Sequence, residues 1–468
     1  MGLRAYIEKP IAFSDANYAE GYNVPISPVH ASSPSSRYIQ LLLTANESYS
    51  CLLSPKAGTI LHRLPERYKQ QAQHQAGPVN DQSKDKHRGS SPIQNDNNIV
   101  YMTPVKVGGQ SLQLVIDTGS SDTWLVSDPF QCKNDAQMPV EEDHCKFGNR
   151  YERTATFEQD KQYTFSIAYA DGERLKGIIG RETVAIGGIT NKNTTIALAH
   201  EANWHGDGVS SGLFGLAFPT ITHAMKGDRP TRYDPVFFSM YKKSLIAPVF
   251  SVALNRKNEG PGVLSLGGLP YKRAAALRYE DDFAVVPMEK IGMADKATGQ
   301  MQYTLYVADA DGFVVGDGVY NFPAKMLVDT GTTMSSVPPT IMRAIEAAWS
   351  PPIWPPCTAK DICRIPCDSV PPKFAIVLGG KQVEIDAKDM VLTHDKDQGG
   401  GRICALGVAP DESLASGGNG LSMIGGSFMK SILVVFDVGA AELRFAKRVR
   451  NTRRNKKERS KKRAGECV

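Results

Sequence analysis

Two short segments of the 468-residue chain carry the same potential chemistry. The segment "VIDTGSSDTW" contains Asp117, and "LVDTGTTMSS" contains Asp329, which lies 212 positions downstream. In both, an apolar run ends in Asp-Thr-Gly and is followed by Ser or Thr. Because glycine permits a tight turn, we expect each Asp at the end of a buried strand. A single Asp-x-Gly is common in turns, whereas two copies in the same context indicate a matched pair.

A matched pair of carboxylates has a defined chemistry. Two carboxylates about 3 Å apart cannot both ionise, so they share one proton. The ionised group can act as base toward a bound water, while the protonated group hydrogen-bonds a substrate carbonyl. Together they would hydrolyse an amide without a covalent intermediate. The pair titrates as a unit, so neither role is assigned to Asp117 or Asp329 individually.

The elements that must position these groups are mostly strands. The run "IVYMTPVKVGGQSLQLVIDTG" alternates apolar and polar residues and breaks at Gly-Gly, which predicts a hairpin. The run "YTFSIAYADGERLKGIIGRETVAIGG" repeats this pattern around Asp171 and Gly172. The clearest helical pattern is "PTIMRAIEAAW", Pro339 to Trp349. Since both Asp-Thr-Gly copies fall within residues 100–447, this region predicts a duplicated lobe of a mostly β protein.

The two ends differ in composition from this region. Residues 1–95 are rich in Pro, Ser, Gln and Asn without sustained periodicity, and we expect a largely irregular pro-segment or N-terminal extension. From Lys447 onward the chain has 11 Lys and Arg against 2 Glu, so residues 448–468 predict a basic, disordered tail. A nucleic acid or a nuclear-import receptor is the alternative partner of this tail. No aromatic residue interleaves with its charges, and we expect no nucleic acid.

The composition is otherwise that of an ordinary globular protein, with 41% hydrophobic and 22% charged residues. It contains no apolar run of about 18 residues, so we expect no membrane span. The start of the sequence also lacks the apolar core of a secretory signal. Either the true N-terminus is missing from this sequence or the protein is intracellular, and both explanations stay open.

The eight cysteines also bear on whether the protein is secreted or intracellular. Cys51 and Cys467 are isolated, and the others form two clusters, which are Cys132/Cys145 and Cys357/Cys363/Cys367/Cys404. Local clusters in a chain of this length favour disulfides in loops and therefore an oxidising compartment. Zinc is the alternative for the second cluster. However, Cys-x5-Cys-x3-Cys lacks the Cys-x2-Cys spacing of zinc sites and has no His pair nearby, so we expect no metal.

These motifs resemble those of the pepsin-like aspartic proteases over roughly residues 98–447. The resemblance implies two pseudo-symmetric β-barrel-like lobes with the active-site cleft between them. Residues 96–285 would form the first lobe, with the first Asp-Thr-Gly and a flap, and residues 286–447 the second. It also implies an aspartic endopeptidase that cleaves peptide bonds in proteins at acid pH, with Asp117 and Asp329 catalytic. We expect no cofactor, a peptide or protein substrate, and a monomer.

The resemblance also implies roles for the residues around both aspartates. Thr118 and Thr330 fall where the two loops of the family support each other, and Ser120 and Thr332 fall where the aspartates are hydrogen-bonded. Gly119 and Gly331 complete the two catalytic loops. The segment "SSGLFGLAFP", from Ser210 to Pro219, resembles the stretch behind the first aspartate.

The flap is the other part of the implied site. Tyr169 falls at the flap-tyrosine position, with Asp171 and Gly172 at the tip, and Trp124 falls where the family supports the flap. The tip departs from the family pattern, because Ala170 and Asp171 stand where Gly and Thr or Asp are usual. Asp171 therefore has two interpretations, a hydrogen bond to substrate backbone or a turn cap.

The resemblance pairs Cys132 with Cys145 and Cys367 with Cys404, which leaves Cys357 for Cys363. Asn193 begins the glycosylation sequence Asn-Thr-Thr, which matters only in a secreted protein. We expect secretion or a vacuolar or lysosome-like acid compartment. One rival hypothesis is a catalytically weak binding or inhibitory protein on the same fold. Such relatives usually lose an Asp, the Asp-Thr-Gly glycine or the flap Tyr, all of which are present here. Another rival is an intracellular protein that its basic tail directs to nucleic acid.

Overall fold

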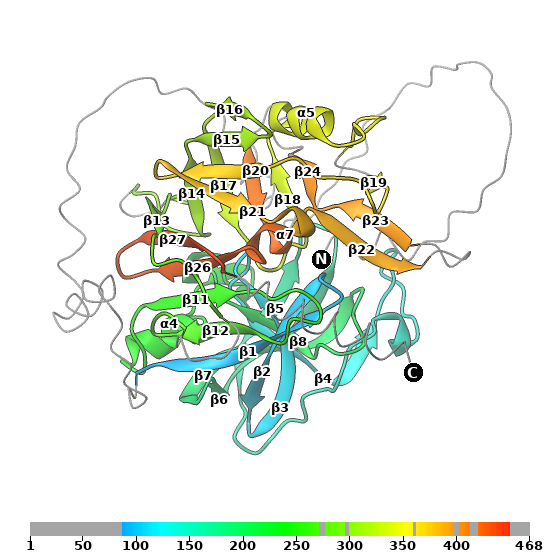
Figure 1. The fold of residues 1–468 in the computed structure, drawn as a ribbon. Coiled ribbons are helices and arrows are strands. Elements are labelled where there is room, and N and C mark those ends of the chain that lie inside the picture. The colour runs from blue at the N-terminus through cyan, green and yellow to red at the C-terminus, as the bar shows by residue number, and fades with distance from the viewer. Residues whose placement is uncertain are drawn as a thin grey trace, which may run out of the picture.

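The computed structural model describes residues 87–270, 277–294, 299–358, 362–396, 402–411 and 420–449. These residues form two lobes, one above the other in Figure 1, built mainly from strands. The predicted mostly β, two-lobed fold is thereby confirmed. Residues 1–86 and 450–468 lie outside the described part, and with them lie Cys51, Cys467 and almost all of the basic tail.

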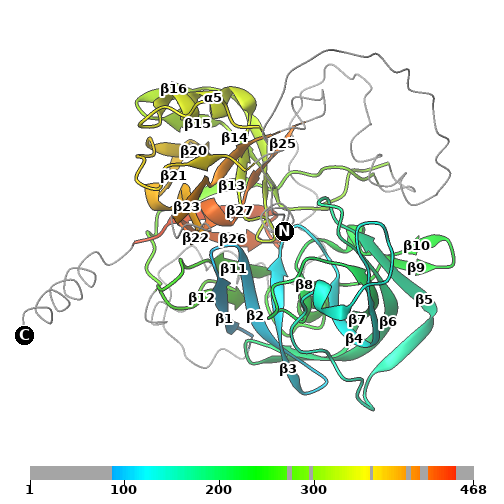
Figure 2. The ribbon, with the colours of Figure 1, turned by 90° about the vertical axis from the view of Figure 1, so that its right-hand side faces the viewer.

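The first lobe is a curled sheet in which the strand order is β10-β9-β5-β6-β7-β4-β8-β3-β2. β6 also pairs with β2, so the sheet closes partly on itself, as in a barrel. Figure 2 shows β9 and β10 beside β5 at the outer edge of this lobe. The strands are β2 (Val100–Val107), β3 (Gln110–Asp117), β4 (Thr123–Cys132), β5 (Glu158–Ala168), β6 (Arg174–Ile186), β7 (Ile189–Asn203), β8 (Gly212–Gly215), β9 (Ala224–Lys226) and β10 (Arg229–Thr231).

A set of strands between the lobes contains segments from both halves of the chain. It continues from the first lobe through β1 (Gly89–Asp96), β12 (Gly262–Leu266), β11 (Val249–Ala253), β26 (Ile432–Asp437), β27 (Glu442–Lys447) and β13 (Ala284–Pro287). The antiparallel pair β11–β26 joins the halves directly, and the buried rings of Phe250 and Phe436 stack with centroids 4.4 Å apart. The two lobes therefore share a hydrogen-bonded sheet and a common apolar core.

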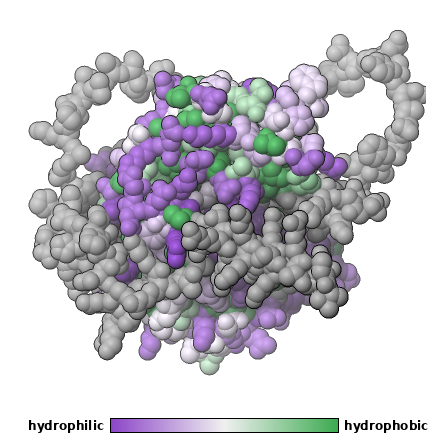
Figure 3. Space-filling view, viewed as in Figure 1, coloured by the Kyte–Doolittle hydropathy of each residue, from purple (hydrophilic) through white to green (hydrophobic). Residues whose placement is uncertain are grey.

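The second lobe contains three smaller sheets. Their orders are β14-β17-β25-β18-β24, β16-β15-β20-β21 and β19-β23-β22. The strands are β14 (Val307–Ala310), β15 (Gly312–Val315), β16 (Gly318–Tyr320), β17 (Ala324–Val328), β18 (Ser335–Val337), β19 (Arg364–Ile365), β20 (Phe374–Leu378), β21 (Lys381–Ile385), β22 (Val391–Lys396), β23 (Arg402–Leu406), β24 (Val408–Pro410) and β25 (Leu421–Ile424). On the face seen in Figure 3, hydrophilic and hydrophobic residues are mixed over this lobe, as is usual for protein surfaces.

Helices are few and short in the described residues. They are α4 (Val236–Lys242), α5 (Pro339–Ala348) and α7 (Gly426–Met429), with 3-10 turns η2 (Glu142–His144), η3 (Pro219–Ile221) and η4 (Ala387–Asp389). α5 confirms the helix predicted from the sequence, and it buries Ile341, Met342 and Ile345 on one side. No helix in the described ranges is long and apolar enough to cross a membrane.

The structure corrects three expected boundaries. Within the segment expected to be irregular, residues 89–95 belong to β1, which pairs with β12 and β2. The prediction failed because β1 is polar in sequence, and its inward-facing Ser91 is satisfied by a 2.8 Å hydrogen bond from Thr103. At the other end Arg448, assigned to the disordered tail, is buried and donates to the Leu254 carbonyl. The expected lobe boundary at 285–286 falls inside β13.

The six clustered cysteines all form disulfides. The pairs are Cys132–Cys145, Cys357–Cys363 and Cys367–Cys404. The thiols that could have made a zinc site are therefore used in covalent bonds. Within the described ranges, no group of three or more His, Cys, Asp or Glu is arranged to hold a metal.

Candidate active site

The two Asp-Thr-Gly segments lie in loops of the same topology. β3 ends at Asp117, and β8 lies between β3 and β4, parallel to the first and antiparallel to the second. In the second lobe β25 lies in the same way between β17, which ends just before Asp329, and β18. Each aspartate is thus placed at the end of a buried strand, and the repeated sequence corresponds to a repeated local fold.

The two loops are held together by reciprocal threonine hydrogen bonds. Thr118 Oγ1 donates to the Val328 carbonyl, and Thr330 Oγ1 donates to the Ile116 carbonyl, both at 2.8 Å. The backbone N–H of each threonine donates to the hydroxyl oxygen of the other, at 3.1 and 3.0 Å. Both threonines are buried. Because these four bonds satisfy both hydroxyls and both amides, they fix the spacing of the two loops across the lobe interface.

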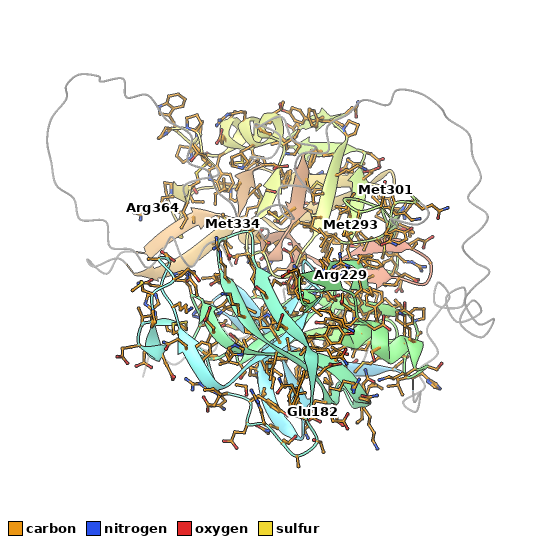
Figure 4. All side chains as sticks on the ribbon, turned by 180° about the vertical axis from the view of Figure 1, so that it is seen from behind. Glu182, Arg229, Met293, Met301, Met334 and Arg364 are labelled. Atoms are coloured by element: carbon orange, nitrogen blue, oxygen red, sulfur yellow. A yellow bond between two sulfur atoms is a disulfide. The ribbon has the colours of Figure 1, made fainter. Side chains whose placement is uncertain are left out.

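Each carboxylate receives the same two donors from its own loop. Asp117 accepts from the Gly119 N–H at 2.8 Å and from Ser120 Oγ at 2.5 Å. Asp329 accepts from the Gly331 N–H at 2.9 Å and from Thr332 Oγ1 at 2.5 Å. The structure therefore brings together all of the catalytic-loop residues named from the sequence. Met334, which follows the second loop, lies where the lobes meet in Figure 4.

The glycines of the two loops make room for the opposite aspartate. A Cβ on Gly119 would lie 2.7 Å from Asp329 Oδ1, and a Cβ on Gly331 would lie 2.5 Å from Asp117 Oδ1. Neither glycine has a left-handed backbone. The expectation that glycine is needed here for a tight turn is therefore wrong. Glycine is needed because the two carboxyl groups approach each other closely.

Burial and the proximity of Asp329 change the protonation of Asp117. Asp117 is 5% exposed and Asp329 8% exposed. Burial raises the pKa of Asp117 to about 7, helped by the charge of Asp329 and opposed by the bonds from Ser120 and Gly119. A site with this pKa keeps a proton throughout the acid range. The pair is consequently able to offer a proton donor and a carboxylate base at the same time.

The stretch from Ser210 to Pro219 lies behind the first aspartate, as expected. The Leu216 N–H donates to the Asp117 carbonyl at 2.8 Å, and the Ala217 N–H donates to the Ser120 carbonyl at 2.9 Å. In the second lobe the Asp329 N–H donates to the Ile424 carbonyl at 3.1 Å. The backbone of each catalytic loop is thus hydrogen-bonded to the strand behind it.

The flap is the hairpin of β5 and β6. At its turn the Tyr169 N–H donates to the Glu173 carbonyl at 2.8 Å, and Gly172 has a left-handed backbone with φ of 95°. Asp171 Oδ1 accepts from the Glu173 N–H at 3.1 Å, so in this structure Asp171 caps the turn. The hydroxyl of Tyr169 accepts a 2.8 Å hydrogen bond from Trp124 Nε1. Trp124 therefore holds the flap tyrosine toward the first catalytic loop.

Sequence reasoning missed two residues beside this arrangement. Trp204 packs edge-on against Tyr169 and Trp124, with ring centroids 5.7 and 5.0 Å away. Asp122, which is fully buried, accepts from both the N–H and the Nδ1 of His223 at 3.0 and 2.8 Å. It also accepts from the Tyr233 hydroxyl at 2.5 Å. Asp122 could have been noticed from the sequence, because it directly follows "DTGSS". Trp204 could not, because only the fold brings it into contact with Tyr169 and Trp124.

Asn193, the expected glycosylation position, is exposed near the start of β7 and has a left-handed backbone with φ of 51°. It lies in the first lobe, outside the hydrogen-bonded network of the two catalytic loops. Its exposure makes the side-chain amide accessible for modification.

Comparison with known proteins agrees with this geometry. A sequence model of the family described as eukaryotic aspartyl protease matches residues 100–448. A probable aspartic-type endopeptidase of Aspergillus fumigatus is 33% identical over 356 residues, which covers 74% of this chain and 78% of the relative. Penicillopepsin-3 of Penicillium janthinellum is 28% identical over 360 residues, with coverage of 76% and 80%.

Among solved structures, the crystal structure of the aspartic proteinase from Irpex lacteus matches with a TM-score of 0.59 at 20% identity. The match covers 78% of this chain and 99% of that structure. At this identity the likeness concerns the fold, and it agrees with the two-lobed β architecture.

Proposed function

The chain belongs to the eukaryotic aspartyl protease family and is an aspartic-type endopeptidase, and from this premise we propose that it cleaves proteins at acid pH by a two-carboxylate mechanism. The observation that carries the proposal is the pair of Asp117 and Asp329, each bonded to its own loop and so close that a Cβ on either loop glycine would clash with the opposite carboxyl group.

In the proposed reaction the pair holds one water between its two carboxyl groups. The carboxylate takes a proton from this water, whose oxygen attacks the peptide carbonyl carbon, while the protonated carboxyl donates to the carbonyl oxygen. The carboxyl group that took the proton from water then gives it to the amide nitrogen, the other carboxylate takes a hydroxyl proton from the tetrahedral intermediate, and the carbon–nitrogen bond breaks, which leaves one proton on the pair. Ser120 and Thr332 keep the carboxyl groups oriented, and Trp124 and Tyr169 place the flap over the peptide.

The alternative, a catalytically weak binding or inhibitory protein on this fold, is not favoured. A degraded site would be expected to lack part of the hydrogen-bond pattern around the aspartates. Here Gly119, Ser120, Gly331 and Thr332 all donate to their aspartates, and Tyr169 is hydrogen-bonded by Trp124.

Other properties of the enzyme follow from the same proposal. Both aspartates come from one chain, so we propose a monomer that needs no second copy to complete the site. Three disulfides suit an oxidising environment, which supports secretion or an acid compartment and makes glycosylation of Asn193 feasible. The polar stretch from Lys84 to Ile99 suits cleavage by its composition, and because β1 is part of the shared sheet we expect a pro-segment to be removed before Gly89, at the front of this stretch.

The test is the pH dependence of cleavage in wild type, Asp117→Asn, Asp329→Asn and the double variant, with a denatured protein as substrate. We expect an acid optimum for wild type, inhibition by a statine-type mimic whose hydroxyl replaces the water, and near-complete loss in each Asn variant. The double variant should be scarcely worse than the single ones, because the two groups act together.

Melting temperatures should show that the Asn variants remain folded, because Asn has the shape of Asp. If either single variant kept more than about a tenth of wild-type activity, a barrier change below about 1.4 kcal/mol, the two-carboxylate mechanism would be wrong. An optimum above neutral pH would contradict the acid-pH part of the proposal.

A further inference from the structure

Glu173 is a buried carboxylate at the base of the flap, outside the catalytic loops. The neighbouring tip residues Asp171 and Gly172 are exposed, whereas Glu173 is 6% exposed. Its carbonyl closes the flap turn by accepting from the Tyr169 N–H. Its side chain turns to the interior. Burying a carboxylate is costly unless it is hydrogen-bonded or paired, so its location calls for a specific partner.

That partner is His205, in the loop between β7 and β8. Glu173 Oε1 accepts from the His205 backbone N–H at 2.7 Å and lies 3.6 Å from His205 Nδ1. Glu173 Oε2 is buried without a hydrogen-bond partner among the described residues. Burial raises the pKa of Glu173, and the nearby carboxylate of Glu173 raises the pKa of His205, to which Asp135 and Asp171 add. In the part of the chain that the structure describes, only one oxygen of the Glu173 carboxylate is hydrogen-bonded. A buried pair such as Glu173 and His205 is therefore weak evidence that these residues stabilise the fold.

The residue next to His205 is Trp204, which contacts the flap tyrosine. Trp204 is 3% exposed, and its ring packs edge-on against Tyr169 and stacks on Phe147, with centroids 5.7 and 5.9 Å away. Fixing the backbone at His205 therefore also fixes the indole that supports Tyr169. The contacts form a closed circuit from Tyr169 through Glu173, His205 and Trp204 back to Tyr169.

The loop that carries Trp204 has a second, independent attachment. The Gly206 N–H donates to the Cys145 carbonyl at 3.0 Å, and the Gly208 N–H donates to the Lys146 carbonyl at 2.7 Å. These bonds hold the loop to the segment closed by the Cys132–Cys145 disulfide. They do not involve Glu173, so loss of the Glu173 side chain should leave the loop folded and free only its flap-facing end.

We propose that Glu173 is a positioning residue for peptide hydrolysis, whose carboxylate holds the His205 backbone and so keeps Trp204 packed against Tyr169 while substrate lies under the flap. The inference rests on the proposed function, because it assigns to the flap the task of orienting a peptide for Asp117 and Asp329. A loose flap tyrosine would bind the peptide in more than one orientation, which weakens binding and productive alignment together.

The matched control is Glu182, on β6, the strand that begins directly after Glu173. It is also buried, at 2% exposure, and it accepts hydrogen bonds from Thr154, Thr156 and the Tyr151 hydroxyl. Figure 4 shows Glu182 at the end of the first lobe that is remote from the second lobe. Glu182→Ala therefore removes a buried, hydrogen-bonded carboxylate from the far end of the flap hairpin, away from the turn that carries Tyr169 and Glu173.

The experiment compares kcat and KM for a peptide substrate, melting temperature, and amide hydrogen exchange of the flap turn in Glu173→Ala, Glu173→Gln and Glu182→Ala. We expect Glu173→Ala to raise KM about tenfold or more and to speed exchange at Tyr169 and Gly172. Glu182→Ala should lower the melting temperature by a similar amount but change KM less than twofold. Glu173→Gln should recover most of the loss, because its amide oxygen can still accept from the His205 N–H.

Equal effects of Glu173→Ala and Glu182→Ala on KM and on flap exchange would overturn the proposal, and so would a failure of Glu173→Gln to recover KM. The outcome is separable from the test of the mechanism. If Asp117→Asn is inactive while Glu173→Ala keeps its KM, only the flap proposal fails, whereas an active Asp117→Asn enzyme contradicts the proposed function itself.

Discussion

At the residue scale, the two aspartates have the same donors but not the same surroundings. Both accept from the N–H two residues on and from a hydroxyl three residues on. Ser120 is buried, however, whereas Thr332 is half-buried. The first loop is therefore more closely enclosed than the second. This difference in enclosure distinguishes the two halves of the pair, and Thr332 Oγ1 has a further contact, at 3.8 Å, with Met423 Sδ.

The loop glycines give a prediction at this scale. Gly331→Ala should lower kcat/KM at least about a hundredfold, a barrier rise of about 2.7 kcal/mol, because its Cβ would meet Asp117 Oδ1 at 2.5 Å and displace that carboxyl group. The fold should survive, since the backbone of Gly331 is not left-handed. The measurement is steady-state cleavage of a peptide at acid pH together with the melting temperature.

Gly318→Ala is the control for this substitution. Its Cβ would approach the flexible side chain of Tyr320 at 3.0 Å, in the outer sheet of the second lobe, and activity should stay within a factor of two. Wild-type kcat/KM in Gly331→Ala would show that close approach of the two carboxyl groups is not required.

At the scale of elements, the flap is coupled to β4 by one hydrogen bond and by aromatic packing. Tyr169→Phe would remove the bond from Trp124 Nε1 but keep the ring contacts with Trp204. We expect kcat/KM to fall about tenfold, since a net hydrogen bond contributes about 1 kcal/mol and the indole N–H is left unpaired. The measurement is the rate of peptide cleavage at saturating and at limiting peptide concentration, which gives kcat and kcat/KM.

Tyr151→Phe provides the comparison in the same lobe. Tyr151 is buried, and its hydroxyl donates to Glu182 at 2.9 Å, away from the flap. This variant should lose stability while kcat/KM stays near that of wild type. Were both variants to lose kcat/KM equally, the bond between Trp124 and Tyr169 would have no special part in catalysis.

At the scale of the whole molecule, an ion pair as well as a shared sheet joins the two lobes. Arg256, which follows β11, forms a two-bond ion pair with the fully buried Asp389 of the second lobe, at 2.7 and 2.8 Å. Ser431 also donates to Asp389, at 2.6 Å. Together with β11–β26 pairing, this pair holds the lobes in the relative position that the aspartates need.

Global stability should depend on pH through Asp117. Its pKa is about 7 in the fold and 3.8 when unperturbed, so between about pH 4 and 7 the folded protein keeps a proton that the unfolded chain has lost. The free energy of unfolding therefore falls as pH rises through this window, by up to about 1.4 kcal/mol per pH unit from this group. The Asn side chain in Asp117→Asn does not titrate, so this decrease is absent from the variant. The free energy of unfolding of Asp117→Asn, minus that of wild type, should therefore increase from pH 4 to 7.

Chemical denaturation at several pH values checks this expectation. Asp228→Asn is the control, because Asp228 is exposed in the turn between β9 and β10. This variant controls for the general effect of replacing one Asp by Asn. A constant difference between Asp117→Asn and wild type across the window would mean that Asp117 titrates alike in folded and unfolded protein.

Local sequence was enough to predict a carboxylate pair and the class of fold. The two Asp-Thr-Gly copies, the alternating strands, the helix of α5 and the clusters of cysteines are all features of neighbouring residues, because turn chemistry, periodicity and composition act over a few positions. The same reasoning failed for β1, whose polar residues are stabilised only by pairing with β12 and β2.

Only the tertiary structure decided which groups meet. The reason for glycine at 119 and 331, the contact of Trp204 with Tyr169, and the pairing of Glu173 with His205 all depend on segments that are distant in sequence. Such contacts leave no local pattern, since a buried side chain is fixed by partners that the sequence does not identify. The sequence by itself determined that two carboxylates exist to be paired, and the packing of two lobes on a shared sheet determined how closely they approach and how far burial raises a pKa.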